Sequence, residues 1–84
     1  MAVMVNSGSS ALYILIESLN LPKGSEVITP ALTFATTVGC LVKNDLVPYF
    51  VDVGVNSYTI NVDQLEEAIN KNTSAIIAPD LMGN

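Results

Sequence analysis

The chain has 84 residues, half of them hydrophobic and only 13% charged, and its net charge is −5. A chain of this length forms one domain at most and buries only about 60% of its unfolded surface. We therefore expect a single, partial domain over residues 1–84, with apolar surface left over for self-association. Three lysines and no arginine or histidine argue against nucleic acid as a partner. One cysteine and no clustered carboxylates argue against a metal site.

The sequence also shows neither a membrane helix nor a signal peptide. No apolar run approaches the roughly 18–20 residues that a membrane helix needs, and the start, MAVMVNSG, lacks the basic segment of a signal peptide. Cys40 is the only cysteine, so it cannot form an internal disulfide, and we expect it to be a buried structural thiol. These features favour a cytoplasmic protein that does not contact membranes.

The first half of the chain predicts two strands and two helices. The apolar run 2–6 (AVMVN) is typical of a strand, and 9–20 carries apolar residues at helical spacing. Pro22 and Gly24 follow as a turn, and the strand EVITP ends at Pro30. Residues 32–43 predict a second helix, whose threonines and glycine make it dependent on tertiary packing and suggest close approach to a neighbouring backbone.

The second half repeats the alternation. VPYFVDV (47–53) predicts a strand covered on both faces. Asn61 and Gln64 resemble a capping box, in which Asn61 caps a helix over 62–70 and Gln64 reaches back to it. SAIIAP (74–79) predicts the last strand. The order β-α-β-α-β-α-β indicates an α/β fold of three layers, αβα, with right-handed crossovers and a mostly parallel sheet of about four strands.

The best local candidate for a binding site is the turn Asn6-Ser7-Gly8-Ser9-Ser10, between the first strand and the first helix. Glycine allows close backbone approach to a ligand, and a helix start offers free N–H groups and a favourable dipole to an anion. The functional interpretation is a phosphate cradle. The alternative is that Ser7 or Ser9 merely caps the helix. The turn is neither a Walker A loop nor a GxGxxG fingerprint.

Three further residues lie at the ends of predicted strands, at the same edge of the sheet. Phe34 can stack on a planar ligand there, and the alternative is an ordinary core position. Asp52 and Asp80 are expected to be solvated or capping carboxylates.

Taken in order, five segments resemble the DegT/StrS family of pyridoxal-phosphate-dependent sugar aminotransferases and dehydrases, which have fold type I. They cover nearly the whole chain: NSGSSAL (6–12), GSEVITPALTFATTV (24–38), VPYFVDV (47–53), YTINVDQLEEAI (58–69) and SAIIAPDLMGN (74–84). The sequences around Thr36-Thr37-Val38 and Gly83-Asn84 lean towards the branch that contains hexulose 3-dehydrases of O-antigen synthesis.

The resemblance implies specific roles. Gly8, Ser9 and Ser10 match the loop that holds the phosphate of pyridoxal or pyridoxamine phosphate through N–H groups and a hydroxyl. Phe34 matches the aromatic residue that stacks on the pyridine ring. The implied substrate is a nucleotide sugar, in the synthesis of lipopolysaccharide or deoxyamino sugars.

The resemblance also implies a truncated enzyme. The family's Schiff-base lysine (or the histidine that replaces it), the aspartate that pairs with the pyridinium nitrogen and a further phosphate-binding serine match nothing here, and Lys23, Lys43 and Lys71 do not align with that lysine. Asp80 stands where many members have histidine. We therefore expect no catalytic residues and no transamination by this chain alone. The alternatives are a small non-catalytic Rossmann-like module that oligomerises or binds a phosphorylated ligand, and an interaction protein with docking apolar faces.

The family fold also implies that strand 2–6 is separated from the other strands by later ones. In this chain it would lose those neighbours, and we expect it to pair on the remaining sheet or with another copy.

Overall fold

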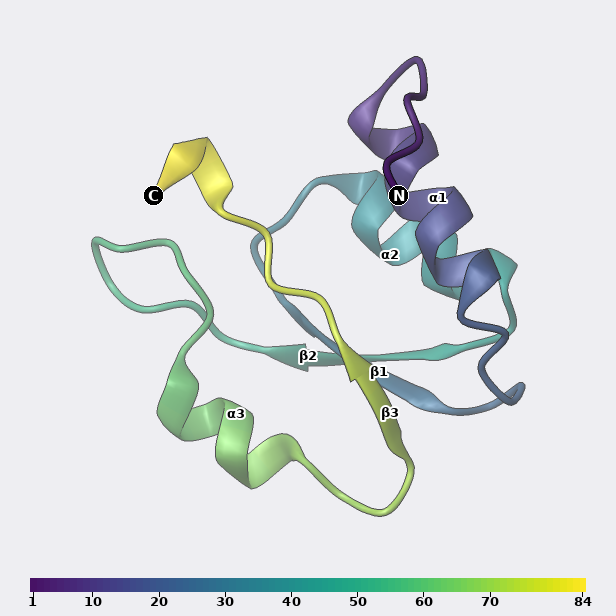
Figure 1. Ribbon diagram of the computed structural model, residues 1–84. Coiled ribbons are helices and arrows are strands. Elements are labelled where there is room, and N and C mark those ends of the chain that lie inside the picture. The colour runs from purple at the N-terminus through teal and green to yellow at the C-terminus, as the bar shows by residue number, and fades with distance from the viewer.

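Helices and strands alternate after an irregular N-terminal segment (Figure 1). The computed structural model describes residues 1–84. Its elements, in chain order, are α1 (Gly8–Ser18), β1 (Glu26–Pro30), α2 (Ala35–Lys43), β2 (Val47–Val51), α3 (Val62–Ala68), β3 (Thr73–Ile76) and a 3₁₀ turn (Leu81–Gly83). None of the helices has the length and apolar character that crossing a membrane requires.

The three strands form one parallel sheet in the order β2-β1-β3. The chain moves from β1 to β2 through α2 and then crosses back over β1 to β3 through α3. Because right-handed crossovers in opposite directions place their helices on opposite faces, α2 and α3 must cover different sides of the sheet. The carboxyl ends of all three strands meet at one edge, which is where ligand sites of open α/β sheets lie.

Two separate cores confirm the three layers. Adjacent residues of β1, Val27 and Ile28, are both fully buried, and they point to opposite faces because side chains alternate along a strand. The Val27 face packs against α1 and α2, through Ile16, Cys40, Leu41 and Leu46. The Ile28 face packs against α3, through Val51 and Ala68. The α/β, three-layer prediction is therefore right, with three strands in place of about four.

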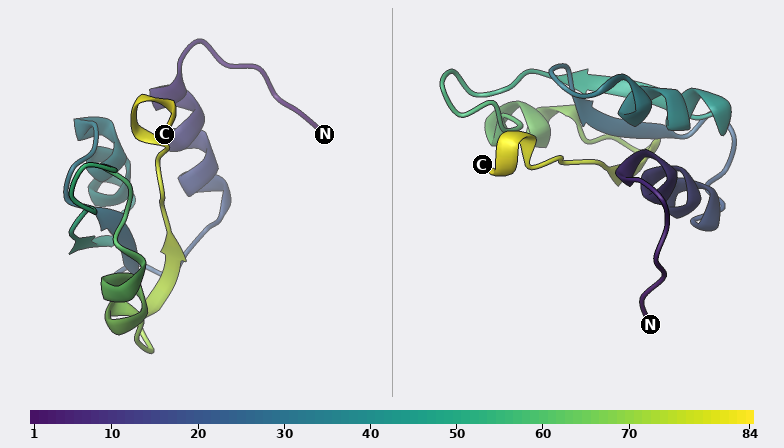
Figure 2. Two further views of the ribbon diagram at one scale, coloured as in Figure 1. Left: turned by 90° about the vertical axis from the view of Figure 1, so that its left-hand side faces the viewer. Right: turned by 90° about the horizontal axis from the view of Figure 1, so that it is seen from above.

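The prediction of a strand over residues 2–6 is wrong. Residues 1–6 form no strand and extend away from the body of the chain (Figure 2). Val3 and Met4 remain exposed, so the expected pairing on the remaining sheet does not occur. An isolated apolar run has no ladder partner for its N–H and C=O groups, and water then satisfies them as well as a strand would.

Helix boundaries follow their caps more closely than their apolar patterns. The side chain of Ser7 caps α1, and Asn20 ends that helix in the left-handed region at φ 47°. The α2 helix begins at Ala35, three residues later than predicted. The expectation that its small residues admit a neighbouring backbone fails at Gly39, because a methyl group there would meet no atom within 4 Å.

The predicted cap of α3 is half right. The side chain of Asn61 accepts from the N–H groups of Asp63 and Gln64, as expected for a cap. Gln64 does not reach back to Asn61. Its Oε1 instead accepts from the Asp52 N–H at 3.1 Å, which ties α3 to the end of β2. The box is incomplete because this free strand-end donor lies within reach of the same side chain.

Candidate phosphate and ring site

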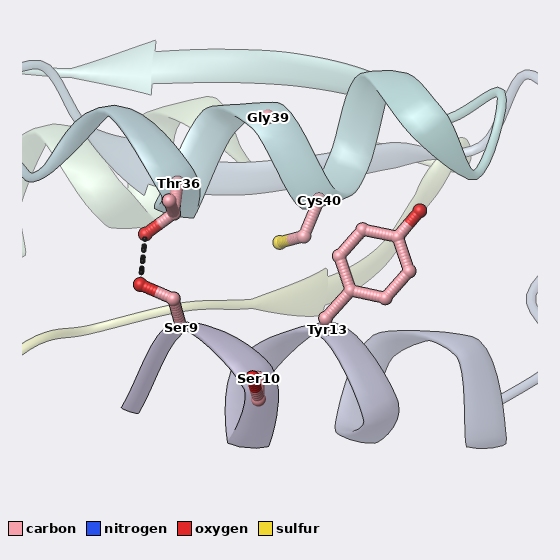
Figure 3. A pocket seen from close by; sticks show the side chains of 6 residues that line it. All are labelled: Ser9, Ser10, Tyr13, Thr36, Gly39 and Cys40. Carbon is pink, nitrogen blue, oxygen red and sulfur yellow. Dashed lines mark hydrogen bonds between the residues drawn. The ribbon is translucent and has the colours of Figure 1, made fainter. Parts of the chain in front are cut away.

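The starts of α1 and α2 lie side by side. Ser9 Oγ and Thr36 Oγ1, 27 residues apart in sequence, are hydrogen bonded at 3.1 Å (Figure 3). Farther along, the Tyr13 ring on α1 stands beside α2, and the Lys43 ammonium lies 4.6 Å from its centroid. The two helices therefore run in the same direction, and their positive dipole ends meet at one place.

The first turn of α1 is only partly completed by side chains. Ser7 Oγ accepts from the Ser10 N–H at 3.1 Å and donates to Ser10 Oγ at 3.0 Å. The Ser7 carbonyl accepts from Ala11 N–H. The N–H groups of Gly8 and Ser9, at the first two helical positions, have no intrahelical acceptor and no other partner. They are exposed, uncrowded donors that suit a phosphate or carboxylate group.

Phe34 stands at the start of α2, in the N-cap position that Ser7 holds on α1. It is the N-cap residue, with extended backbone (φ −71°, ψ 144°) and no side-chain cap. Its carbonyl accepts from the Thr37 N–H at 2.9 Å, and Thr33 Oγ1 donates to Thr37 Oγ1 at 2.9 Å, so the backbone of this turn is well tied. The residue is 70% exposed. The alternative that Phe34 is a core residue is therefore wrong.

A groove of about 270 Å³ separates the two helices below these starts. Its lining joins both helix starts to the Tyr13 ring: Ser9, Ser10, Tyr13, Thr36, Gly39 and Cys40 (Figure 3). Cys40 is almost fully buried and donates to the Thr37 carbonyl at 3.1 Å. Burial raises the pKa of the Cys40 thiol, because the thiolate loses its hydration. The prediction of a buried structural thiol is confirmed.

The three lysines lie far from the helix starts. Lys23 follows α1 and pairs with Asp45 at 2.8 Å, Lys43 ends α2, and Lys71 precedes β3. All three positions come just before a strand, so they belong to the amino edge of the parallel sheet. At 1.5 Å per residue, α2 alone separates that edge from Phe34 by about 13 Å.

The carboxylates at the carboxyl edge take no part in the site. Asp52 is exposed, and its Oδ1 accepts from the neighbouring Val53 N–H at 2.8 Å. Asp80 is exposed and makes no cap hydrogen bond to the 3₁₀ turn. No three acidic or cysteine side chains lie close enough to share a metal ion.

The structure thus brings Gly8, Ser9 and Ser10 together in one turn and places the turn bearing Phe34 next to it. Reasoning from the sequence missed Thr36, which joins the two. Its position two residues after Phe34 was visible in the sequence, but nothing there indicated that α1 and α2 would lie side by side.

Comparison with known proteins identifies the same scaffold. The dTDP-4-dehydro-2,6-dideoxy-D-glucose 3-dehydratase of Saccharopolyspora spinosa is 42% identical over 99% of this chain and 20% of its own length. The structure of the Escherichia coli GDP-4-keto-6-deoxy-D-mannose 3-dehydratase with bound hydrated PLP matches 90% of this chain and 21% of its own, with 38% identity and a TM-score of 0.86.

NtdA of Bacillus subtilis with bound PMP matches 86% of this chain and 17% of its own, with 36% identity and a TM-score of 0.80. The chain spans about a fifth of the length of these relatives. The family model for DegT/DnrJ/EryC1/StrS aminotransferases matches residues 1–84. The chain therefore belongs to the DegT/DnrJ/EryC1/StrS aminotransferase family.

Proposed function

We propose that residues 1–84 supply the cofactor-binding half of a pyridoxal or pyridoxamine phosphate site. The Gly8 and Ser9 N–H groups and the Ser10 hydroxyl bind the phosphate, and Phe34 stacks on the pyridine ring. The observation that carries the proposal is the pair of unpaired amides next to the turn that bears an exposed aromatic ring. Relatives of the same scaffold bind PLP or PMP, which supports it.

The residues present fit such a group. A phosphate dianion at Gly8 and Ser9 would satisfy donors that otherwise face water and would meet the positive dipole ends of two helices. No acidic residue lies in the first turn of either helix to repel it. Phe34 has a free ring face at the same edge, and a planar heterocycle can stack on it.

For the whole protein we propose a cytoplasmic nucleotide-sugar 3-dehydratase or aminotransferase of lipopolysaccharide or deoxyamino-sugar synthesis. When bound, the cofactor supplies an electron sink for the sugar substrate. The residues of this chain would hold its phosphate and would offer the Phe34 ring as a stacking surface. Proton transfer needs a lysine or histidine close to the ring, and all three lysines here lie at the opposite edge of the sheet. We therefore propose that this chain by itself binds but does not transaminate.

We also propose that the chain self-associates. Val3, Ile14 and Leu15 are each more than half exposed, and they line one apolar hollow between the N-terminal segment and α1. Contiguous exposed apolar surface of this kind favours association. Sedimentation analysis should show dimers or larger species, and a monomer at all concentrations would contradict this expectation.

The binding proposal is tested by titrating the 84-residue chain with pyridoxamine phosphate, which has no aldehyde and cannot react with lysines. Saturable amide shifts at Gly8 and Ser9, together with shifts of the Phe34 ring protons, are expected. Shifts without a Phe34 response would favour a general phosphate-binding module. A parallel incubation with pyridoxal phosphate and borohydride tests catalysis, since a stoichiometric adduct at one lysine would contradict the binding-only role.

A further inference from the structure

The Ser9–Thr36 hydrogen bond joins the side chains at the starts of α1 and α2. It lies at the end of the helix pair where the phosphate donors and Phe34 are carried. The buried contacts between the helices, through Ile16, Cys40 and Leu41, lie farther along. The two starts share no other hydrogen bond.

Phe34 is linked to this tie through the first turn of α2. The residue is 70% exposed, so its side chain has little packing of its own. Its backbone is fixed to the first turn of α2 through the bond from Thr37 N–H to its carbonyl. Thr36 belongs to that same turn and is bonded to Ser9, which carries one of the phosphate donors. A shift of the α2 start relative to α1 would therefore change the separation between the ring and the phosphate.

The hydroxyl groups divide into two kinds. Ser9 Oγ shares its hydrogen bond with Thr36 Oγ1. Ser10 Oγ accepts from Ser7 Oγ, so its own proton remains free for an acceptor. Ser10 can thus donate to an anion without disturbing the bond between the two helices.

We propose that Ser9 and Thr36 form a positioning latch, which sets the distance between the phosphate cradle on α1 and the stacking ring on α2. Thr36 is a positioning residue that acts through Ser9, and the Ser9 side chain serves the latch while its N–H serves the phosphate. This inference rests on the proposed function and adds to it a division of roles between neighbouring hydroxyls.

The test compares the affinities of two ligands for variants of Thr36, Ser9 and Ser10. Inorganic phosphate reports the cradle alone, and the extra affinity for pyridoxamine phosphate reports the ring contact. Thr36→Val removes the hydroxyl at nearly constant shape, and Thr36→Ser restores it. We expect Thr36→Val to leave phosphate affinity within about twofold and to weaken pyridoxamine phosphate about two- to tenfold, the size of one net hydrogen bond. Thr36→Ser should bind like the unmodified chain.

The serine variants separate the two roles. Ser9→Ala should behave like Thr36→Val, and the double variant should lose no more than either single one, because both remove the same bond. Ser10→Ala should weaken both ligands. Unchanged pyridoxamine phosphate affinity in Thr36→Val would overturn the latch and leave the proposed function standing. No amide shift at Gly8 or Ser9 in the unmodified chain with either ligand would overturn both.

Discussion

The helices α1 and α3 both begin at the carboxyl edge of the same sheet, but the N–H groups of their first turns are capped differently. In α3, Asn61 Oδ1 accepts from the Asp63 N–H at 3.1 Å and the Gln64 N–H at 3.4 Å, and an acidic residue stands in the first turn. In α1, Ser7 accepts only from Ser10 N–H, and no acidic residue follows. The α3 start leaves one donor, the Val62 N–H, without an acceptor and carries a negative charge, whereas the α1 start leaves two donors and no charge to offset its dipole.

The proposed anion site therefore differs from the α3 start in being less completely capped. Every helix offers unpaired N–H groups, so their presence alone distinguishes nothing. The α1 start is distinguished by the lack of a side-chain acceptor for Gly8 and Ser9, by the absence of negative charge and by a second helix start beside it. Four changes would break or sharpen this contrast.

The largest effect is expected from Ser9→Asp, which gives α1 the acidic residue that α3 has at the same helical position. Two unit charges about 4 Å apart repel by about 1 kcal/mol in water and about 4 kcal/mol near a protein surface, so phosphate affinity should fall at least about fivefold. The same carboxylate should stabilise the helix by about 0.3–1 kcal/mol. Calorimetric titration and thermal unfolding would measure the two effects.

The matched control is Ser9→Asn, which has the same size without the charge. It should retain most of the phosphate affinity and give no dipole stabilisation. Equal losses in the two variants would show that shape and not charge governs the α1 start.

Asn61→Ala should affect only stability. It removes the acceptor of two N–H groups of α3, and losses of such caps typically cost about 1 kcal/mol. For a domain of this size that lowers the melting temperature by about 4–8 °C. Phosphate affinity should not change, because the cradle is on α1. A loss of binding that matches the loss of stability would mean that the two starts are not independent.

Phe34→Ala should affect only binding of the ring. The exposed side chain contributes little to the core, so unfolding free energy should change by less than about 0.5 kcal/mol. Affinity for pyridoxamine phosphate should fall by about 0.5–1.5 kcal/mol, while affinity for inorganic phosphate stays constant. Phe34→Leu keeps the apolar bulk without the aromatic face. If it binds as well as the unmodified chain, stacking is not the contact.

The smallest effect is expected at Cys40, which lines the groove between α1 and α2. Burial raises the pKa of its thiol, so the folded chain keeps this proton to higher pH than the unfolded chain does. The contribution to stability is therefore complete below the ordinary thiol pKa of about 8.5 and is lost as pH rises above it. Denaturant unfolding from pH 7 to pH 10 should show a steeper decline than in Cys40→Ala. Equal losses of stability with pH in the two chains would refute a contribution from the Cys40 thiol.

Local signals in the sequence were sufficient for much of the fold. Alternating periods predicted the α/β layers, and Ser7 and Asn61 marked two helix starts, because caps depend on residues within one turn. Gly8, Ser9 and Ser10 were identifiable for the same reason. Phe34 could be placed at the edge of the sheet because it follows a strand that ends in Pro30.

Features that depend on partners distant in sequence could not be predicted. Residues 2–6 have strand-like composition, but a strand also needs a neighbour, and none lies beside them. Gln64 bonds to Asp52 because the end of β2 approaches α3 in space. The Ser9–Thr36 bond requires the sideways packing of two helices, about which the pattern of either helix alone carries no information.

The contrast between α1 and α3 can be measured directly in a single sample, by following backbone amide shifts while inorganic phosphate is added. An incomplete α1 start predicts saturable shifts at Gly8 and Ser9, with Asp63 and Gln64 unmoved as an internal reference. Equal shifts at both helix starts, or none at Gly8 and Ser9, would contradict the assignment of α1 as the phosphate cradle.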